Sequence, residues 1–343
     1  MMNKLLKSAL TTFAVLSLLG FSLAITPLQA RAEMSELTVE RAFGIAYLPL
    51  MLMERDKLVE KHARAAGIPD LKVTWVTFGS GSALNDALLS GSLQIAVGGT
   101  PSLITLWSKT RGGMGVRGIA SMSAIPMYLN SSNPAVKTIA DFTEKDKIAL
   151  PGVKISVHAV TLEMAATKMW GPANYAKLDP QTVTLSHPEG MAAMLSGISE
   201  ITAHFTSPPY QNEELKKPGI HRVLSSYDVL GGQHSFSVAW TTAKFHDQNP
   251  KLYKAFLDAL QESIAMIAND KQDAARGYLQ ISKDKISQAE VVQLLDEPDI
   301  AFTTTPQRTM QYADFMYSVH TIPLKPNSWK DLFFPEIQGA PGS

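Results

Sequence analysis

Residues 93–107 read L-Q-I-A-V-G-G-T-P-S-L-I-T-L-W, and the rest of the chain can be arranged around this stretch. Residues 93–97 are short, apolar and partly β-branched, which predicts a strand. Gly98-Gly99 should end the strand, after which Thr100 suits a helix N-cap and Pro101 the first helical position. A strand that turns directly into a helix presents backbone N–H groups and the positive end of the helix dipole. Because glycines also allow close approach, we predict a ligand-facing turn here, with a capped turn that binds nothing as the alternative.

The same strand, turn and helix unit occurs twice earlier in the chain. Residues 37–43 alternate as a strand, and Pro49 opens one helix after the turn Gly44-Ile45-Ala46-Tyr47. Residues 71–78 form the next strand, which the turn Gly79-Ser80-Gly81-Ser82 joins to a helix. Repeated units of this kind predict a parallel sheet with its turns on one edge. Ligands of open α/β sheets bind outside the carboxyl ends of the strands, so these turns are expected to face a ligand.

The second half of the chain predicts further turns of this type. Ser156 is a plausible N-cap for a long helix whose first N–H groups would point at a cleft. Residues 201–205 form a strand that runs into the turn Ser207-Pro208-Pro209-Tyr210. Residues 123–138 and 227–234 are rich in Pro, Gly, Asn and Ser, and we predict that they cross into a second lobe and return from it.

The first 32 residues are typical of a secretion signal. Lys4 and Lys7 make a basic region, residues 9–25 are largely apolar, and Ala30-Arg31-Ala32 is a small-x-small cleavage site. We therefore predict a Sec signal peptide cut near Ala32 and a periplasmic protein. An uncleaved membrane anchor is the alternative, and the Ser, Thr and Gly residues within the apolar run argue against it. The chain has no cysteine, so it has neither a thiol for lipid attachment nor a disulfide framework.

The charge balance argues against a nucleic-acid partner. The chain carries 31 basic and 31 acidic residues, and removal of the predicted signal peptide would leave 28 and 31, a net charge of −3. Nucleic-acid binding usually requires a basic face. Single hydrophobic cores stop growing near ~250–300 residues, so two lobes are expected.

Four segments together carry a resemblance to a known family. They are G-I-A-Y-L-P-L at 44–50, V-G-G-T-P-S at 97–102, D-K-I-A-L-P-G-V-K-I-S-V-H-A-V-T at 146–161 and T-S-P-P-Y at 206–210. With the signal peptide, the chain resembles the substrate-binding proteins of ABC importers in the nitrate/sulfonate/taurine class. Their fold is shared with yeast-type thiamine-pyrimidine synthases.

The resemblance implies an α/β chain with the two-lobed type II periplasmic-binding-protein fold, two crossover strands and a ligand cleft between the lobes. Lobe 1 would comprise residues 33–125 plus 236–343, and lobe 2 residues 126–235. The implied function is a periplasmic receptor that delivers a small organic or anionic ligand, sulfonate-, nitrate- or taurine-like or related, to the permease and ATPase of an inner-membrane importer. The protein would act as a monomer, without cofactor, metal or catalytic residues. The alternatives are an enzyme or precursor-binding protein similar to the thiamine-pyrimidine synthases, and a purely structural exported protein.

Motifs for catalysis are missing from the sequence. It contains no G-x-S-x-G, H-E-x-x-H or G-K-[ST] pattern, and the lack of cysteine excludes thiol nucleophiles. The G-x-G-x-x-G match at 113–118 follows a predicted helix and precedes a strand, so it is not a dinucleotide site. The second lobe and the return from it contain five histidines whose spacing fits no zinc-site pattern. They are His158, His187, His204, His221 and His234.

The expected ligand contacts all lie on the turns described above. They are Ala46, Tyr47, Ser80, Gly81, Gly99, Thr100, Pro101, Ser156, His158, Pro208 and Tyr210. His158 lies at a helix start, where the dipole should disfavour its protonation, although a structural role is the alternative. Tyr47 and Tyr210 are either aromatic walls of the cleft or ordinary packing. The expected turns carry no arginine, which weakens the case for a sulfonate or carboxylate clamp and leaves room for neutral or aromatic ligands.

Overall fold

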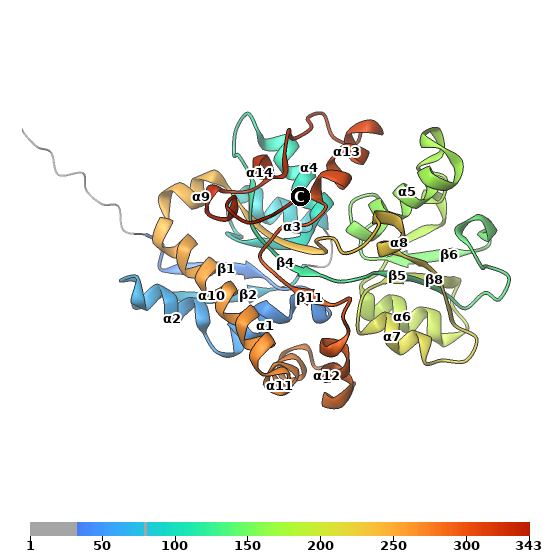
Figure 1. The fold of residues 1–343 in the computed structure, drawn as a ribbon, viewed down its shortest axis with the longest axis horizontal. Helices are drawn as coiled ribbons and strands as arrows, with labels where there is room; N and C mark the ends of the chain where they lie inside the picture. Colours follow the sequence, from blue (N-terminus) through green and yellow to red (C-terminus); the bar gives the residue numbers. More distant parts are fainter. Residues whose placement is uncertain (1–32, 79–80) are drawn as a thin grey trace, which may run out of the picture. The chain divides into compact units, whose positions relative to one another are not determined.

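The computed structural model describes residues 33–78 and 81–343, and residues 33–343 form one compact unit. The predicted signal peptide and Ser80 therefore lie outside the described residues. The strands form three sheets with the orders β1-β2, β11-β4-β10-β3 and β7-β6-β8-β5-β9 (Figure 1). The first two sheets contain β1 (Glu36–Glu40), β2 (Lys72–Val76), β3 (Ala96–Gly99), β4 (Arg117–Ala124), β10 (Ser237–Thr241) and β11 (Ala301–Phe302). The third contains β5 (Tyr128–Ser131), β6 (Lys147–Leu150), β7 (Thr182–Thr184), β8 (Ile201–Thr206) and β9 (His221–Ser225).

The first two sheets join at their edges. Val39 forms a parallel bridge with Ile95, and the Glu40 N–H donates to the Ile95 carbonyl at 3.0 Å. The strands β1 and β2 are parallel, as are β6 and its neighbours β7 and β8, which confirms the predicted pairing there. The parallel arrangement predicted for the three repeated units is present, since the bridge between Val39 and Ile95 is also parallel. The strands at the crossovers differ, because β10 runs antiparallel to β3 and β4, and β5 runs antiparallel to β8 and β9.

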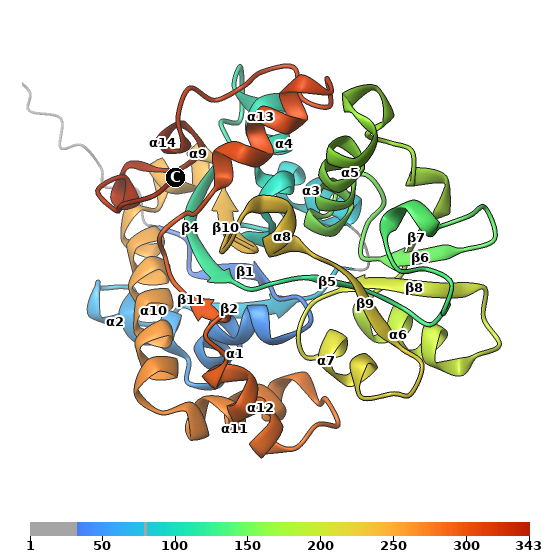
Figure 2. The ribbon, with the colours of Figure 1, turned by 45° about the vertical axis from the view of Figure 1, so that its right-hand side comes forward.

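Two connections link the third sheet to the others. Between β4 and β5 the chain passes through residues 125–127, and Figure 2 shows this link as a nearly continuous ribbon. The return from β9 runs through α8 (Ser226–Leu230), a helix that the sequence did not predict, and reaches β10. The strands of the third sheet thus fall between residues 128 and 225, and all other described strands fall outside that range. The lobe boundaries at residues 126 and 235 stay a prediction.

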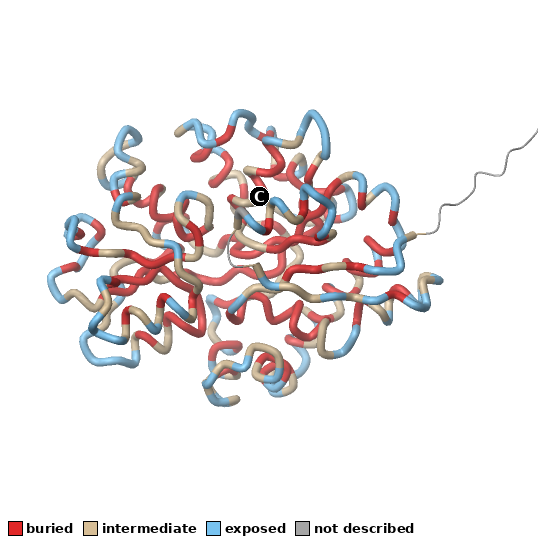
Figure 3. The backbone as a smooth tube through the Cα atoms, turned by 180° about the vertical axis from the view of Figure 1, so that it is seen from behind, coloured by how far each residue is buried: buried red, intermediate tan, exposed pale blue. Residues whose placement is uncertain are grey.

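The helices surround these sheets, and some of them pack on other helices, as α11 does on α1 and α12 (Figure 1). Those in the first third of the chain are α1 (Leu48–Arg55), α2 (Leu58–Ala65), α3 (Gly81–Ser90) and α4 (Thr100–Thr110). Those between β6 and β9 are α5 (Val157–Trp170), α6 (His187–Ser196) and α7 (Tyr210–Leu215). The remainder are α9 (Ala243–Gln248), α10 (Pro250–Asn269), α11 (Lys271–Ser282), α12 (Gln288–Asp296), α13 (Thr309–Ser318) and α14 (Trp329–Leu332). Figure 3 shows that the buried backbone is concentrated in the central strands and the inner turns of the helices. Within the described residues, no helix has both the length and the hydropathy that crossing a membrane requires.

The predicted single helix after Pro49 is in fact two helices. Lys57 adopts a left-handed conformation with φ 51°, which separates α1 from α2. The Arg55 guanidinium at the end of α1 pairs with the Asp56 carboxylate at 2.7 Å and with the Asp273 carboxylate of α11 at 2.6 Å. The break is thus fixed in part by a contact more than 200 residues away, which the local pattern does not contain.

The structure also corrects the turn at Thr100. Gly98 and Gly99 belong to β3, because they pair with residues of β10, and Gly99 is the N-cap of α4. Thr100 is therefore the first helical residue and not the cap. Its buried hydroxyl donates to the Ser235 carbonyl at 2.8 Å. Thr100 thus ties α4 to the return crossover. The predicted N-cap of α5 is confirmed, since the Ser156 side chain accepts from the Ala159 N–H at 3.2 Å.

Candidate ligand-binding site

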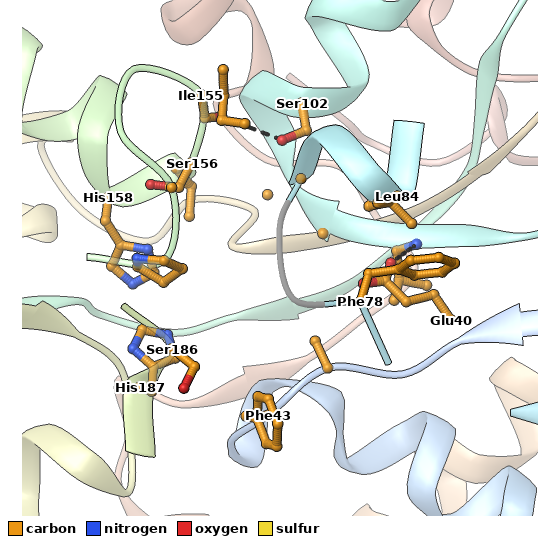
Figure 4. A pocket seen from close by; sticks show the side chains of 18 of the residues that line it. Glu40, Phe43, Phe78, Leu84, Ser102, Ile155, Ser156, His158, Ser186 and His187 are labelled. Carbon is orange, nitrogen blue, oxygen red and sulfur yellow. Dashed lines mark hydrogen bonds between the residues drawn. The ribbon is translucent and has the colours of Figure 1, made fainter. Parts of the chain in front are cut away.

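A pocket of about 140 Å³ lies where strand ends of different sheets meet (Figure 4). One side is built from the carboxyl ends of β1, β2 and β3 with the start of α3, and the other from the turn after β6 and the starts of α5 and α6. The first side contributes Glu40, Ala42, Phe43, Tyr47, Phe78, Gly81, Leu84, Val97, Gly98, Gly99 and Ser102. The second contributes Pro151, Gly152, Ile155, Ser156, Val157, His158, Ser186 and His187, and Phe236 is the residue directly before β10. Helix starts and strand ends thus converge as expected for an α/β ligand site.

Five of the predicted contact residues line this pocket. They are Tyr47, Gly81, Gly99, Ser156 and His158. Gly99 comes close to the opposite side, because a Cβ atom built on it would lie 2.6 Å from the Cβ of Val157. Above the pocket, the Ser102 hydroxyl donates to the Ile155 carbonyl at 3.3 Å (Figure 4). That these residues contact a ligand stays a prediction.

Five other predicted residues do not line the pocket, because each is engaged elsewhere. The Ala46 carbonyl accepts from the Ser237 hydroxyl at 3.3 Å, which places it against β10. The Thr100 hydroxyl is bonded to the return crossover. Pro101 follows it as the buried second residue of α4. The remaining two, Pro208 and Tyr210, lie behind the pocket.

Pro208 and Tyr210 connect the turn after β8 to other elements. The Pro208 carbonyl accepts from the Ile45 N–H at 3.1 Å. The Tyr210 ring stacks on His187 with centroids 5.6 Å apart, and its hydroxyl donates to Asp284 at 3.4 Å. Tyr210 therefore supports a pocket residue and does not itself line the pocket.

Glu40 is a pocket residue that the sequence analysis missed. Its side chain is 5% exposed, and its Oε2 accepts from the Val97 N–H at 3.0 Å. Burial raises the pKa of Glu40 to about 8, against a smaller lowering by that N–H. Among the described residues that line the pocket, Glu40 is the only acid, and none is Lys or Arg. The sequence placed Glu40 inside the predicted strand 37–43, whereas the structure ends β1 at Glu40, so the local pattern gave no signal that this side chain would line the pocket.

His158 lies at the opposite end of the pocket from Glu40 (Figure 4). It is 2% exposed and packs edge-on against Phe205, Phe236 and His187, with ring centroids 5.0 to 5.6 Å away. Neither ring nitrogen has a hydrogen-bond partner among the described residues. Burial, with smaller contributions from other histidines, lowers the pKa of His158 well below its usual range, so the ring is neutral at pH 7. A neutral imidazole offers one donor and one acceptor, which a ligand in the pocket could satisfy.

His187 faces His158 and is held by a buried chain of polar groups. Its Nδ1 shares a hydrogen bond of 2.8 Å with the Thr206 hydroxyl and lies 3.5 Å from His204 Nε2. The His204 Nδ1 in turn bonds to Glu214 Oε1 at 2.5 Å, and all of these side chains are buried. Burial lowers the pKa of His187 well below its usual range. The sequence analysis considered His187 only for zinc, whereas the structure places it as the first residue of α6.

The described residues contain no group of three or more His, Asp or Glu side chains placed to hold a metal ion. The pocket therefore presents a carboxyl group at one end, two neutral imidazoles at the other and mostly apolar walls between them.

No protein-family model matches this sequence, and no curated protein matches it. Solved structures do match. The alkanesulfonate-binding protein SsuA from Xanthomonas axonopodis pv. citri bound to MOPS has a TM-score of 0.66 and 17% identity, covering 85% of this chain and 96% of that chain. The periplasmic aliphatic sulphonate binding protein SsuA from Escherichia coli has a TM-score of 0.62 and 18% identity, covering 88% and 92%. The periplasmic nitrate-binding protein NrtA from Synechocystis PCC 6803 has a TM-score of 0.66 and 16% identity, covering 85% and 83%. At these identities the similarity shows the fold, so the chain has the α/β periplasmic-binding-protein fold that was predicted.

Proposed function

We propose that this protein is a periplasmic solute receptor that delivers a small ligand to the permease and ATPase of an ABC importer. The observation that carries the proposal is the pocket, whose walls come from strand ends and helix starts around different sheets. It contains His158, whose two ring nitrogens have no hydrogen-bond partner in the described part of the chain. An unpaired buried polar group costs about 1–3 kcal/mol, so a ligand that satisfies it gains affinity. The fold supports this role, since the similar structures described above are sulfonate- and nitrate-binding proteins.

Export is part of the same proposal. The basic residues, apolar run and cleavage site within residues 1–32 support secretion to the periplasm, with the mature chain starting near Glu33. Glu33 is the first described residue, and its carboxylate accepts from the Lys251 and Leu252 N–H groups at 3.0 and 2.8 Å, at the start of α10. A mature chain that begins there would keep this contact.

The pocket volume limits the size of the ligand. At about 140 Å³ it is close to an engineered cavity of about 150 Å³ that binds benzene, so a ligand with one ring fits. The best small ligands gain up to about 1.5 kcal/mol per heavy atom, which limits a ligand of about seven atoms to about 10 kcal/mol. That corresponds to a Kd on the order of 10⁻⁷ to 10⁻⁸ M, which is sufficient for a receptor.

The ligand we propose is a small organic compound and not a simple inorganic anion. The described lining residues include no Lys or Arg, so they offer no positively charged side chain to an anion. The start of α5 would contribute about 0.3–1 kcal/mol to an anion, which is too little to hold nitrate or sulfonate by itself. The apolar and aromatic walls favour an organic ring.

An enzyme of the thiamine-pyrimidine-synthase type is less well supported. Among the residues that the structure describes, the three serine hydroxyls on the pocket wall already bond to the backbone or act in a helix cap. Ser102 donates to a carbonyl, Ser156 caps α5, and Ser186 donates to the Glu189 carboxylate at 2.6 Å in the capping box of α6. None of them is paired with a histidine as an activated nucleophile would be.

Native mass spectrometry of protein purified from a periplasmic extract without denaturation tests the proposal. We expect a small molecule bound at one per chain, released unchanged on unfolding. The matched variants are Leu84→Phe, which narrows the pocket, and Leu89→Phe on the exposed side of the same helix. Leu89→Phe should retain the molecule and a folded Leu84→Phe should lose it. If the protein converts the recovered molecule into a product when the two are mixed again, the result would instead favour an enzyme.

A further inference from the structure

We infer that the ligand of this pocket is an organic cation of single-ring size, such as an ammonium, an amidinium or a protonated nitrogen heterocycle, and that Glu40 binds its charge. This inference rests on the proposed function and names the class of ligand.

The position of Glu40 carries the inference. A carboxyl group that is 5% exposed is rarely buried without a partner, because charge is costly to remove from water. The neighbouring Arg41 does not serve it, since the Arg41 Nε lies 3.2 Å from the Glu54 carboxylate. The only hydrogen bond that the described residues give the Glu40 carboxyl group is from the Val97 N–H. A cation in the pocket would form the ion pair with Glu40 that none of the described basic residues forms.

Aromatic rings form the walls next to Glu40. Figure 4 shows Phe78 beside the Glu40 carboxyl group, with Phe43 on the loop below. Tyr47 and Phe236 also line the pocket and meet edge-on, with centroids 6.3 Å apart. The faces of such rings attract cations. Phe43 is 43% exposed although it lines the pocket, so a ligand could cover an apolar surface that the free protein leaves open to water.

The opposite end of the pocket tolerates a cation. Burial holds His158 and His187 in their neutral forms, so they do not repel a positive charge. The unpartnered nitrogens of His158 can bond a second polar group of the ligand. An anion would find no positive charge to pair with, because the described lining residues include one acid, two neutral imidazoles and no basic residue.

Binding of a cation to Glu40 should release a proton. The titratable groups that face the Glu40 carboxyl group are Tyr47 beside it and His158 and His187 across the pocket, while β3 offers only backbone there. With a pKa of about 8, the carboxyl group is mostly protonated at pH 7 and must ionise to pair with the cation. The apparent affinity should therefore rise with pH and level off above about pH 8, by roughly fiftyfold between pH 6 and pH 8.

Three probes of one shape and different charge test the inference: benzamidinium, benzamide and benzoate. Titration calorimetry on the wild-type protein should show binding in the order benzamidinium, benzamide, benzoate, with the predicted rise in benzamidinium affinity between pH 6 and pH 8. The Glu40→Gln variant keeps an acceptor for the Val97 N–H, so it should fold. It should bind benzamidinium at least about tenfold more weakly and lose the pH dependence. The control Glu36→Gln, on the exposed start of the same strand, should behave as wild type.

The outcomes separate this inference from the proposed function. Stronger binding of benzoate or benzamide than of benzamidinium, or an unchanged benzamidinium affinity in Glu40→Gln, would overturn the inference and leave a receptor for another ligand class. Binding of none of the three would also overturn it, because a ring-sized pocket for organic cations must hold a single-ring amidinium at millimolar concentration. The proposed function is tested separately: it fails if the natively purified protein holds no small molecule and none is found to bind, or if the bound molecule is converted into a product.

Discussion

Replacement of Gly99 by alanine should push the two sides of the pocket apart. The added Cβ would lie 2.6 Å from the Val157 Cβ and 3.0 Å from its Cγ1, whereas carbon atoms pack best at about 3.5–4.0 Å. Gly99 has a φ of −69°, so the alanine backbone itself is not strained. The whole effect must therefore come from the contact between β3 and the start of α5.

The magnitude follows from how that contact is relieved. One side has to move by about 1 Å, and overpacking of this kind costs about 1–3 kcal/mol. For a protein of this size the melting temperature should fall by roughly 2–6 °C. Because the strain is relieved when α5 moves away from β3, the affinity for the co-purifying ligand should fall as well.

Thermal unfolding and calorimetric titration of Gly99→Ala test this reasoning. The matched control is Gly112→Ala, since a Cβ at Gly112 meets no atom within 4 Å. We expect the control to melt and bind like the wild type. If Gly99→Ala is indistinguishable from Gly112→Ala in both measurements, β3 and α5 do not approach each other as described.

Three further predictions concern side chains in and around the pocket. Thr100→Ala loses the buried hydrogen bond to the Ser235 carbonyl, so it should lower the free energy of unfolding in urea by about 1–2 kcal/mol. Thr100→Ser keeps the hydroxyl and should be as stable as the wild type, and the ligand affinity of both variants should be unchanged. Glu40 has a pKa raised to about 8 in the folded protein, so the folded state keeps a proton that the unfolded state releases from about pH 4.5 upwards. Its contribution to stability should therefore fall as the pH rises to about 8. Between pH 5 and pH 9, the free energy of unfolding of Glu40→Gln in urea should rise by about 3–5 kcal/mol relative to that of the wild type. If the two proteins show the same pH dependence, the assigned burial of Glu40 is wrong. Glu214→Gln weakens the buried bond to His204 that supports His187, so it should reduce ligand affinity severalfold although Glu214 lies outside the pocket, and an unchanged affinity would show that this chain has only a structural role.

The features that the sequence predicted well are local ones. Ser156 caps α5 through a hydrogen bond three residues along the chain, so its residue type is enough to predict it. The repeated strand and turn units likewise predicted that strand ends would surround a pocket, because the rule depends only on the order of elements.

The features that were missed depend on distant contacts. Whether β3 ends before or after Gly99 is decided by its pairing with β10, about 140 residues later, and this pairing moves Thr100 from the cap into the helix. Tyr210 was expected in the pocket, yet its stacking on His187 places it behind the wall. Glu40 was expected inside a strand and His187 was considered only for zinc, whereas the structure places them at the end of β1 and the start of α6, and the sequence does not show which way their side chains would turn.

Equilibrium binding of the natively recovered ligand tests the central claim most directly. The ligand released from the purified protein would be identified by mass and titrated calorimetrically into ligand-free wild-type protein, and the mixture would then be analysed for products. A receptor should bind one molecule per chain with a Kd below about 1 µM and return it chemically unchanged. Conversion of the ligand, or the same affinity in a folded Leu84→Phe variant with a narrowed pocket, would contradict the proposal of a solute receptor that binds at this site.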